Sequence, residues 1–194
     1  MRQKFQNASS FIKKMVKSPQ EIGAVMPSGK KLCRSMAQHI GVDENEIYVE
    51  VGVGTGVMTR ALVEAGIPQE NLYLFESEEG FIAELKEKFP KANVIHGDAQ
   101  FLQKYLCQNG IGKVSKIVSS LPFKSLPKPV AANILEQFDM ILKPNGKIVQ
   151  FTYAVNEPYP SSFKNTYGFA AYRKNYVAKN IPPATVWLYT RSTI

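Results

Sequence analysis

Short apolar runs alternate with longer segments of helical periodicity along most of the chain. The apolar runs cover residues 47–51, 71–76, 92–96, 116–120 and 147–154. Segments with apolar residues at i, i+3 and i+4 follow the first four, at 57–65, 78–89, 99–108 and 128–142. Strands that alternate with helices in this way are typical of a parallel sheet with helices on both faces.

The C-terminal part of the chain has a different pattern. Residues 169–178 and 184–191 read as two more strands, which we expect to form an antiparallel hairpin at the sheet edge. No further long helical pattern is present there. The sequence therefore predicts an α/β fold with a seven-stranded, mostly parallel sheet that ends in an antiparallel hairpin.

Two helices are predicted before the first strand. Residues 3–17 form a basic amphipathic helix, which either lies in a membrane interface or packs on the domain. Ser28 is placed to cap a second helix, which runs to Ile40 and ends at Gly41. We therefore divide the chain into a basic helical extension, residues 1–41, and a main domain, residues 42–194.

Net charge is +8 over the 194 residues, and it is concentrated at the two ends of the chain. Residues 1–41 carry +7 and residues 151–194 carry +4, whereas the segment between them carries −3. Such asymmetry suggests an anionic partner, either a membrane or a nucleic acid. Solvated surface lysines are the simpler alternative.

Composition excludes several other classes of protein. No apolar run is long enough to span a bilayer, and the N-terminus lacks the apolar core of a secretory signal. Cys33 and Cys107 lack the spacing of metal ligands and do not form a disulfide framework. We expect a reduced, cytoplasmic protein with two buried cysteines and no metal.

The turn after the first strand carries the strongest chemical signal. It contains Glu50 and then glycines at alternate positions, Gly52, Gly54 and Gly56. A dinucleotide-binding fingerprint needs a later third glycine, and a P-loop needs a Gly-Lys-Ser/Thr ending. Acid-x-Gly-x-Gly-x-Gly instead resembles the S-adenosylmethionine (AdoMet) loop of Rossmann-like methyltransferases. A tight strand-to-helix turn with no ligand is the alternative.

Two more acids end the next two strands. Glu76 is placed to accept hydrogen bonds from both ribose hydroxyls, or to sit as an acid at a helix N-terminus capped by Ser77. Asp98 is placed beside an adenine amine, or as an N-cap. With Glu50 near the cationic end of AdoMet, one ligand explains all three acids. The predicted cofactor-binding residues are Glu50, Gly52, Gly54, Thr55, Gly56, Glu76, Ser77, Asp98, Ala99 and Ser119.

The fourth strand ends in Ser119-Ser120-Leu121-Pro122-Phe123. This segment resembles the Asn-Leu-Pro-Tyr corner of ribosomal RNA adenine dimethyltransferases. It departs from that corner because Ser120 replaces the Asn, whose side chain accepts from the target amine, and Phe123 replaces the Tyr. The departure counts against adenine as the substrate.

Several segments together resemble the soluble bacterial phospholipid N-methyltransferases, over nearly the whole chain. Beside the glycine loop and the two strand-end acids, they are Ala24-Val25-Met26-Pro27-Ser28, Ser119-Ser120-Leu121-Pro122, Gln150-Phe151-Thr152-Tyr153 and Asn180-Ile181-Pro182-Pro183-Ala184. The resemblance implies AdoMet as the methyl donor and phosphatidylethanolamine as the acceptor, methylated towards phosphatidylcholine. It also implies a cytoplasmic enzyme associated peripherally with the membrane.

Candidate substrate residues follow from that chemistry. A lipid phosphate needs donors, for which Ser28, Lys30 and Lys31 are candidates at a helix N-terminus. A methylated amine suits aromatic faces, for which the candidates are Phe123, Tyr153 and Tyr176. The acceptor amine must also lose a proton, and the predicted catalytic residues are Tyr153 as a proton acceptor with Ser119 and Ser120 orienting the amine.

Two other functions stay open from the sequence. A ribosomal RNA adenine dimethyltransferase shares the glycine loop and a related corner, and a basic surface suits RNA. Because Ser120 and Phe123 depart from the corner of those enzymes, we expect a membrane as the partner more than a nucleic acid. The second alternative is a non-catalytic membrane-binding protein with an AdoMet-type fold.

Overall fold

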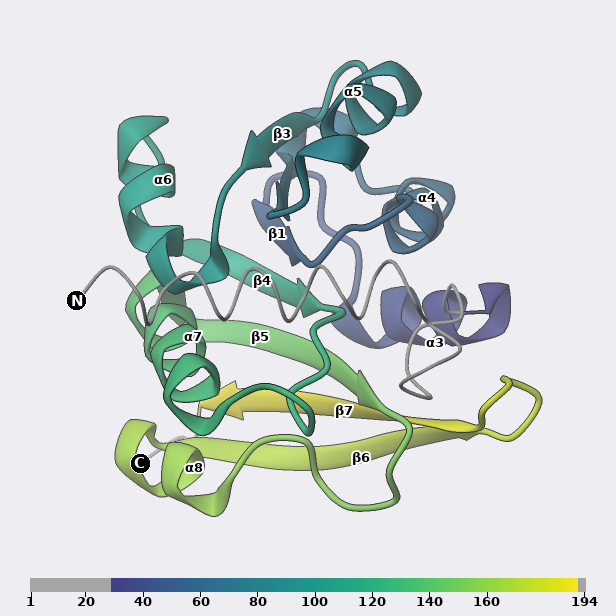
Figure 1. Cartoon of the computed structure of the whole chain (residues 1–194), viewed down its shortest axis with the longest axis vertical. Helices are drawn as coiled ribbons and strands as arrows, with labels where there is room; N and C mark the ends of the chain where they lie inside the picture. The colour runs from purple at the N-terminus through teal and green to yellow at the C-terminus, as the bar shows by residue number, and fades with distance from the viewer. Residues whose placement is uncertain (1–28, 192–194) are drawn as a thin grey trace.

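The sheet predicted from the alternating pattern is present in a computed structural model, which describes residues 29–191 (Figure 1). Its strand order is β3-β2-β1-β4-β5-β7-β6, parallel except for the last two strands. The predicted fold class is confirmed. The strands are β1 (Tyr48–Val51), β2 (Leu72–Glu76), β3 (Asn93–His96), β4 (Val114–Ser119), β5 (Leu142–Thr152), β6 (Phe169–Val177) and β7 (Ala184–Arg191).

Helices cover both faces of the sheet. One apolar cluster joins the sheet to α3 (Lys30–Ile40), α4 (Val57–Glu64) and α5 (Glu79–Lys88). A second joins the other face to α6 (Leu102–Gln108), α7 (Lys128–Ile141) and α8 (Ser161–Tyr167). Short 3-10 turns occur at Gln69–Asn71 and Ala99–Phe101. The helices form because their apolar residues recur on one side, as Leu32, Met36 and Ile40 do on α3, and burial of that side stabilises them.

The structure differs from the prediction mainly in four features, besides shifts of one or two residues at element ends. Helix α8 was not predicted, because seven residues are too few to show a periodicity. Strand β5 begins at Leu142 and not at 147, because Leu142 already pairs with Val114 of β4. The register then shifts, and regular pairing with β4 continues from Lys147. The predicted helix 99–108 begins as a 3-10 turn. Ser77 does not cap α5. The N-cap residue of this helix is Glu78, whose side chain makes no capping hydrogen bond.

The N-terminal predictions fall mostly on residues 1–28. The amphipathic helix at 3–17 and the cap at Ser28 lie outside the described residues; the N-cap residue of α3 is Gly29. Helix α3 itself shares the core of the main domain, with Leu32, Met36 and Ile40 fully buried.

The cysteine prediction was half right. Cys33 on α3 is buried, but Cys107 on α6 is exposed, and neither forms a disulfide bond. Among residues 29–191, no helix is long and apolar enough to cross a membrane.

A single buried amide ties α3 to the turn between β6 and β7. The Oδ1 atom of Asn180 accepts the Gly29 N–H at 2.9 Å, and its Nδ2 atom donates to the Pro182 carbonyl at 2.7 Å. A Cβ atom at Gly29 would lie 2.7 Å from that Oδ1 atom, so glycine permits the close approach. The start of α3 therefore lies beside this turn.

We predict that Asn180→Ala lowers the free energy of unfolding by about 1–3 kcal/mol, because the Gly29 N–H loses its acceptor in a site that is 5% exposed. Urea unfolding measures the change. Lys179→Ala, at the exposed neighbouring position, is the control and should stay within about 0.5 kcal/mol of the unchanged protein. Equal effects of the two substitutions would contradict the prediction.

Candidate active site

The predicted site residues gather at the carboxyl edge of the sheet, as a parallel arrangement requires. Glu50 lies on β1, Glu76 ends β2, Asp98 follows β3 and Ser119 ends β4. These strands are neighbours in the order β3-β2-β1-β4. The structure therefore brings the three acids and the serine to one edge.

The glycine loop needs its glycines for two different reasons. Gly52, Gly54 and Gly56 all have positive φ, at 77°, 56° and 79°. A Cβ atom at Gly52 or Gly56 would also lie 2.8 Å from Leu121 or 2.6 Å from Phe89. At Gly54 nothing lies within 4 Å of such an atom. Gly54 is thus the place where the loop backbone is open to a ligand.

Glu76 holds the loop through its carboxylate. Its Oε2 atom accepts the Gly54 N–H at 2.7 Å, and its Oε1 atom accepts the Glu78 N–H at 2.8 Å. The side chain is 3% exposed. A carboxylate has about four acceptor positions, so two remain for ribose hydroxyls after these bonds are made.

Glu50 is the most unusual acid in the described structure. It is fully buried, the Thr59 hydroxyl donates to its Oε2 atom at 2.8 Å, and its Oε1 atom has no partner among residues 29–191. Burial, followed by the charge of Glu76, raises the pKa of Glu50 to about 8. A buried acceptor without a donor is costly, and a cationic ligand would satisfy it.

Asp98 acts as an N-cap, as one of its two predicted roles requires. Its Oδ1 atom accepts the Gln100 N–H at 2.9 Å, and its Oδ2 atom accepts from the Gln100 side chain at 3.1 Å. Ala99 is buried, Ser77 is half-buried and Thr55 is exposed. All of these positions belong to the loops after β1, β2 and β3.

The corner after β4 is supported by a buried hydrogen-bond network that the sequence analysis missed. Gln150 on β5 pairs with Ser119 in the sheet, and its Nε2 atom donates to the Leu121 carbonyl at 3.0 Å. The Tyr159 hydroxyl donates to Gln150 Oε1 at 3.2 Å. Burial raises the pKa of Tyr159, and a hydrogen bond with the Ser119 side chain opposes the shift. A glutamine within an apolar strand was a signal for this network; Tyr159, in a loop, gave none.

The aromatic candidates are not alike. Phe123 is 7% exposed and packs edge-on against Tyr159 and Phe138, at ring-centroid distances of 4.7 and 6.1 Å, so little of its ring faces a ligand. Tyr153 follows β5 at the carboxyl edge and is half-buried, with its ring 5.3 Å from that of Phe151. Tyr176 is 50% exposed on β6, the edge strand.

Lys30 and Lys31 are exposed in the first turn of α3, at the end of the helix that is bonded to Asn180.

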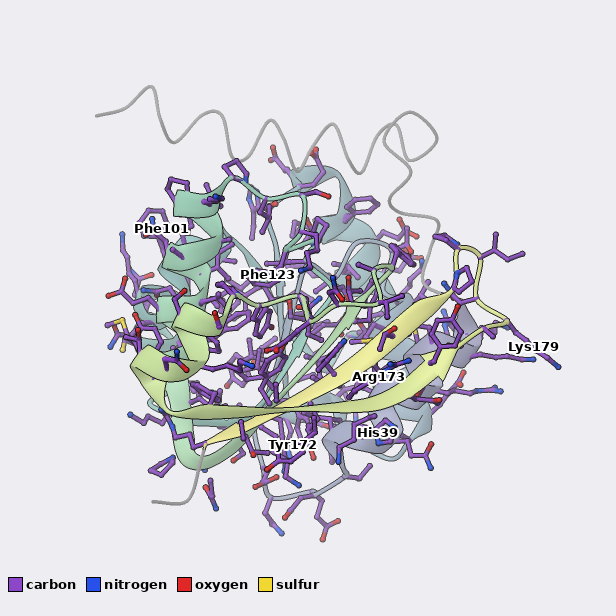
Figure 2. All side chains as sticks on the ribbon, turned by 90° about the horizontal axis from the view of Figure 1, so that it is seen from below. His39, Phe101, Phe123, Tyr172, Arg173 and Lys179 are labelled. Carbon is purple, nitrogen blue, oxygen red and sulfur yellow. The ribbon has the colours of Figure 1, made fainter. Side chains whose placement is uncertain are left out.

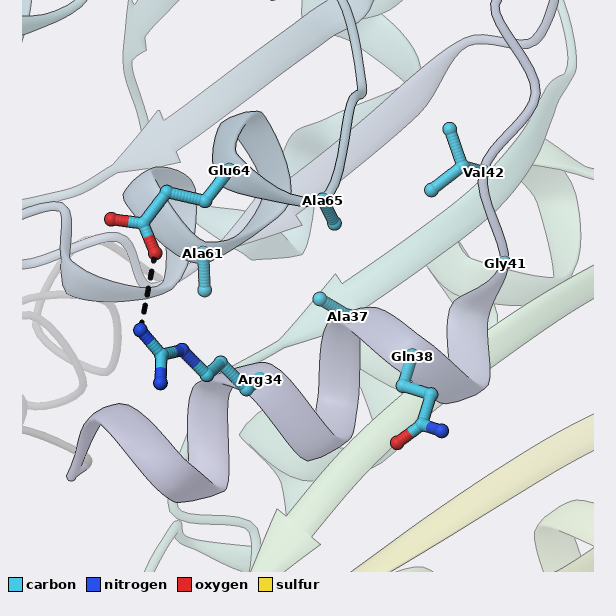
Figure 3. Close-up of a pocket in the computed structure, with 8 residues that line it drawn as sticks. All are labelled: Arg34, Ala37, Gln38, Gly41, Val42, Ala61, Glu64 and Ala65. Atoms are coloured by element: carbon cyan, nitrogen blue, oxygen red, sulfur yellow. Dashed lines mark ion pairs between the residues drawn. The ribbon is translucent and has the colours of Figure 1, made fainter.

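Figure 3 shows a groove between α3 and α4, toward the C-terminal ends of both helices, where Arg34 and Glu64 form an ion pair at 3.9 Å. Gly41 and Val42, which precede β1, also line it. The groove therefore lies at the amino edge of the sheet, away from the acids.

The residues present fit AdoMet. The open backbone at Gly54, the free acceptor positions of Glu76 and the unpartnered Oε1 atom of Glu50 match an adenosine joined to a cationic end. Residues 29–191 contain no group of His, Cys, Asp or Glu placed to bind a metal. The fold and this edge define the class of Rossmann-like methyltransferases.

Comparison with known proteins identifies the family. The family described as "Methyltransferase domain" matches residues 49–146, which span the glycine loop, the strand-end acids and the corner after β4. The chain belongs to this family of AdoMet-dependent methyltransferases. The expected cofactor is therefore confirmed.

Two groups of curated relatives bear on the substrate. The chain is 30% identical to "Ornithine lipid N-methyltransferase" of Singulisphaera acidiphila, over 73% of this chain and 76% of that protein. It is 24% identical to "Ribosomal RNA small subunit methyltransferase A" of a Hydrogenobaculum strain, over 66% of this chain. The match spans only 48% of that second relative, so this chain covers about half its length.

Solved structures agree with the fold. Magnesium protoporphyrin IX methyltransferase (ChlM) of Synechocystis, solved with bound SAM, has a TM-score of 0.65 and 13% identity, over 84% of this chain and 79% of that one. TrmN of Thermus thermophilus also has a TM-score of 0.65, at 12% identity, over 92% of this chain and 53% of that one.

We predict that the protein without ligand loses stability as the pH rises from about 5 to 8. The raised pKa of Glu50 means that the folded protein keeps a proton which the unfolded chain releases above the ordinary value of 4.5. The contribution of Glu50 to the free energy of unfolding falls by up to about 1.4 kcal/mol per pH unit in that window. Urea unfolding at several pH values measures it.

Glu50→Gln should flatten this pH dependence, because the amide does not titrate. Glu64→Gln, at a 54% exposed carboxylate, is the matched control and should keep the slope of the unchanged protein. A slope that survives in Glu50→Gln would contradict the assignment.

Proposed function

We propose that this methyltransferase transfers a methyl group from AdoMet to the primary amine of a membrane-lipid headgroup, with phosphatidylethanolamine as the first candidate. The observation that carries the proposal is the 30% identity to the ornithine lipid N-methyltransferase across 73% of the chain. Ornithine lipid and phosphatidylethanolamine both present a primary amine at a bilayer surface. The Ser119-Ser120-Leu121-Pro122 corner, without the Asn of RNA adenine dimethyltransferases, agrees with such an acceptor.

The proposed cofactor roles follow from the strand ends. Glu76 accepts from the ribose diol, Asp98 lies beside the adenine, and Glu50 faces the cationic end. When bound, AdoMet supplies a methyl group on a sulfonium, which is a good leaving group. The chain mainly has to position the amine and exclude water.

The proposed acceptor roles belong to the other half of the edge. Ser119 and Ser120 orient the amine, and Tyr153 or water accepts its proton. The network of Gln150 and Tyr159 keeps the corner rigid, because it holds the Leu121 carbonyl and the Ser119 side chain in place by buried hydrogen bonds. Lys30 and Lys31 donate to the lipid phosphate.

We predict that Gly54→Ala weakens AdoMet binding at least tenfold, measured by calorimetry, because the methyl group occupies the open side of the loop. The positive φ of 56° adds about 1–2 kcal/mol of strain. Gly110→Ala is the matched control, since Gly110 has a φ of 72° and equally open surroundings but follows α6. It should lose similar stability and keep its AdoMet affinity. Unchanged affinity in Gly54→Ala would overturn the assignment of AdoMet to this loop.

The acceptor is tested by incubating the protein with labelled AdoMet and three acceptors together. These are vesicles containing phosphatidylethanolamine, vesicles containing ornithine lipid, and unmethylated small-subunit ribosomal RNA. Label in either lipid supports a lipid N-methyltransferase, and the ratio between the lipids names the headgroup. Label confined to the RNA, or no label despite AdoMet binding, overturns it in favour of an RNA methyltransferase or of a non-catalytic protein.

A further inference from the structure

The turn between β6 and β7, residues 178–183, exposes an apolar side chain with no partner to cover it among the described residues. Ile181 is 76% exposed, more than any other large apolar side chain in residues 29–191. Figure 1 shows the hairpin projecting past the end of β5. Val155, in the loop after β5, is next at 66%.

Both exposed side chains lie at the edge of the sheet that carries the active site. Strand β7 runs antiparallel to β5, and Thr185 near its start pairs with Thr152 at the end of β5. The turn before β7 and the loop after β5 are therefore neighbours at the carboxyl edge. A partner surface that binds this turn would therefore lie against the carboxyl edge, where the acceptor amine of the proposed reaction enters.

The two chain segments that meet at the turn carry positive charge and no negative charge. Residues 173–183 contain Arg173, Lys174 and Lys179 and no acid, and residues 29–42 contain Lys30, Lys31 and Arg34 and no acid. The Asn180–Gly29 hydrogen bond joins these two segments. Lys179, Lys30 and Lys31 are exposed and form no ion pair with a carboxylate of the described residues; Figure 2 shows Lys179 at the outer end of the hairpin.

We infer that this turn is a membrane-docking element, which inserts Ile181 into the interface of an anionic bilayer while Lys179, Lys30 and Lys31 contact lipid phosphates. An exposed aliphatic side chain with lysines on its own turn and on the segment bonded to that turn matches the layered chemistry of the interface, apolar below and anionic above. A nucleic acid would use the lysines but offers little to an isoleucine. The inference rests on the proposed function only in taking the acceptor to lie in a bilayer.

Sedimentation of the full chain with vesicles tests the inference without AdoMet or methyl transfer. The vesicles contain phosphatidylglycerol and phosphatidylethanolamine, and vesicles of phosphatidylcholine alone report the part that does not depend on charge. Lys179→Glu should lower the partition coefficient at least about fivefold, since one lysine near an anionic surface contributes roughly 1 kcal/mol. Ile181→Asp should lower it at least as much.

The matched control is Val42→Asp. Val42 is 49% exposed in the segment before β1, at the opposite edge of the sheet, so the same change of an apolar residue to Asp should alter partitioning less than twofold. Unfolding midpoint and AdoMet affinity verify that each variant is folded. Because binding is measured without catalysis, a failure of methyl transfer would leave this result standing.

Partitioning of Ile181→Asp that equals that of Val42→Asp overturns the inference. A loss of affinity for an RNA duplex in Lys179→Glu, with vesicle binding unchanged, also overturns it and assigns the surface to nucleic acid.

Discussion

The carboxylate of Glu76 links the parts on which the cofactor edge depends. It accepts an N–H from Gly54 in the loop after β1 and another from Glu78 in the loop after β2. One buried charge thereby fixes two loops that come from neighbouring strands. Gly54 has no Cβ atom on the side that is open to a ligand, and its N–H is fixed by its hydrogen bond to Glu76. The loop is consequently ordered before any ligand arrives, which reduces the entropy that binding must overcome.

A second buried polar group has the same function on the other side of β1. Gln150 ties β5 to the carbonyl of Leu121, and Tyr159 completes its hydrogen bonds. The edge thus has one half ordered by the carboxylate of Glu76 and another half ordered by the amide of Gln150. The half with the carboxylates suits the cationic cofactor, and in the function we propose the acceptor amine enters at the neutral half.

Much of this was predictable from the sequence, for physical reasons that differ by residue. The positions of Glu50, Glu76 and Asp98 at one edge followed from where the short apolar runs end in the sequence, because parallel strands bring their carboxyl ends together. What could not be predicted was hydrogen bonding between distant segments. Tyr159 reaches Gln150 from an irregular loop, and Asn180 meets Gly29 across 151 positions. No local pattern encodes such contacts. The seven-residue α8 was missed because it is too short to show a periodicity, and burial of Phe163 stabilises it.

The strand order has a consequence for synthesis of the protein. Strand β7 lies between β5 and β6, although it follows both in the chain. Until β7 leaves the ribosome, β6 has no strand to pair with, and β5 presents an open edge of unpaired backbone groups. Such an edge is a template for pairing with other chains. The open edge of β5 therefore persists until β7, the last described strand, fills the gap.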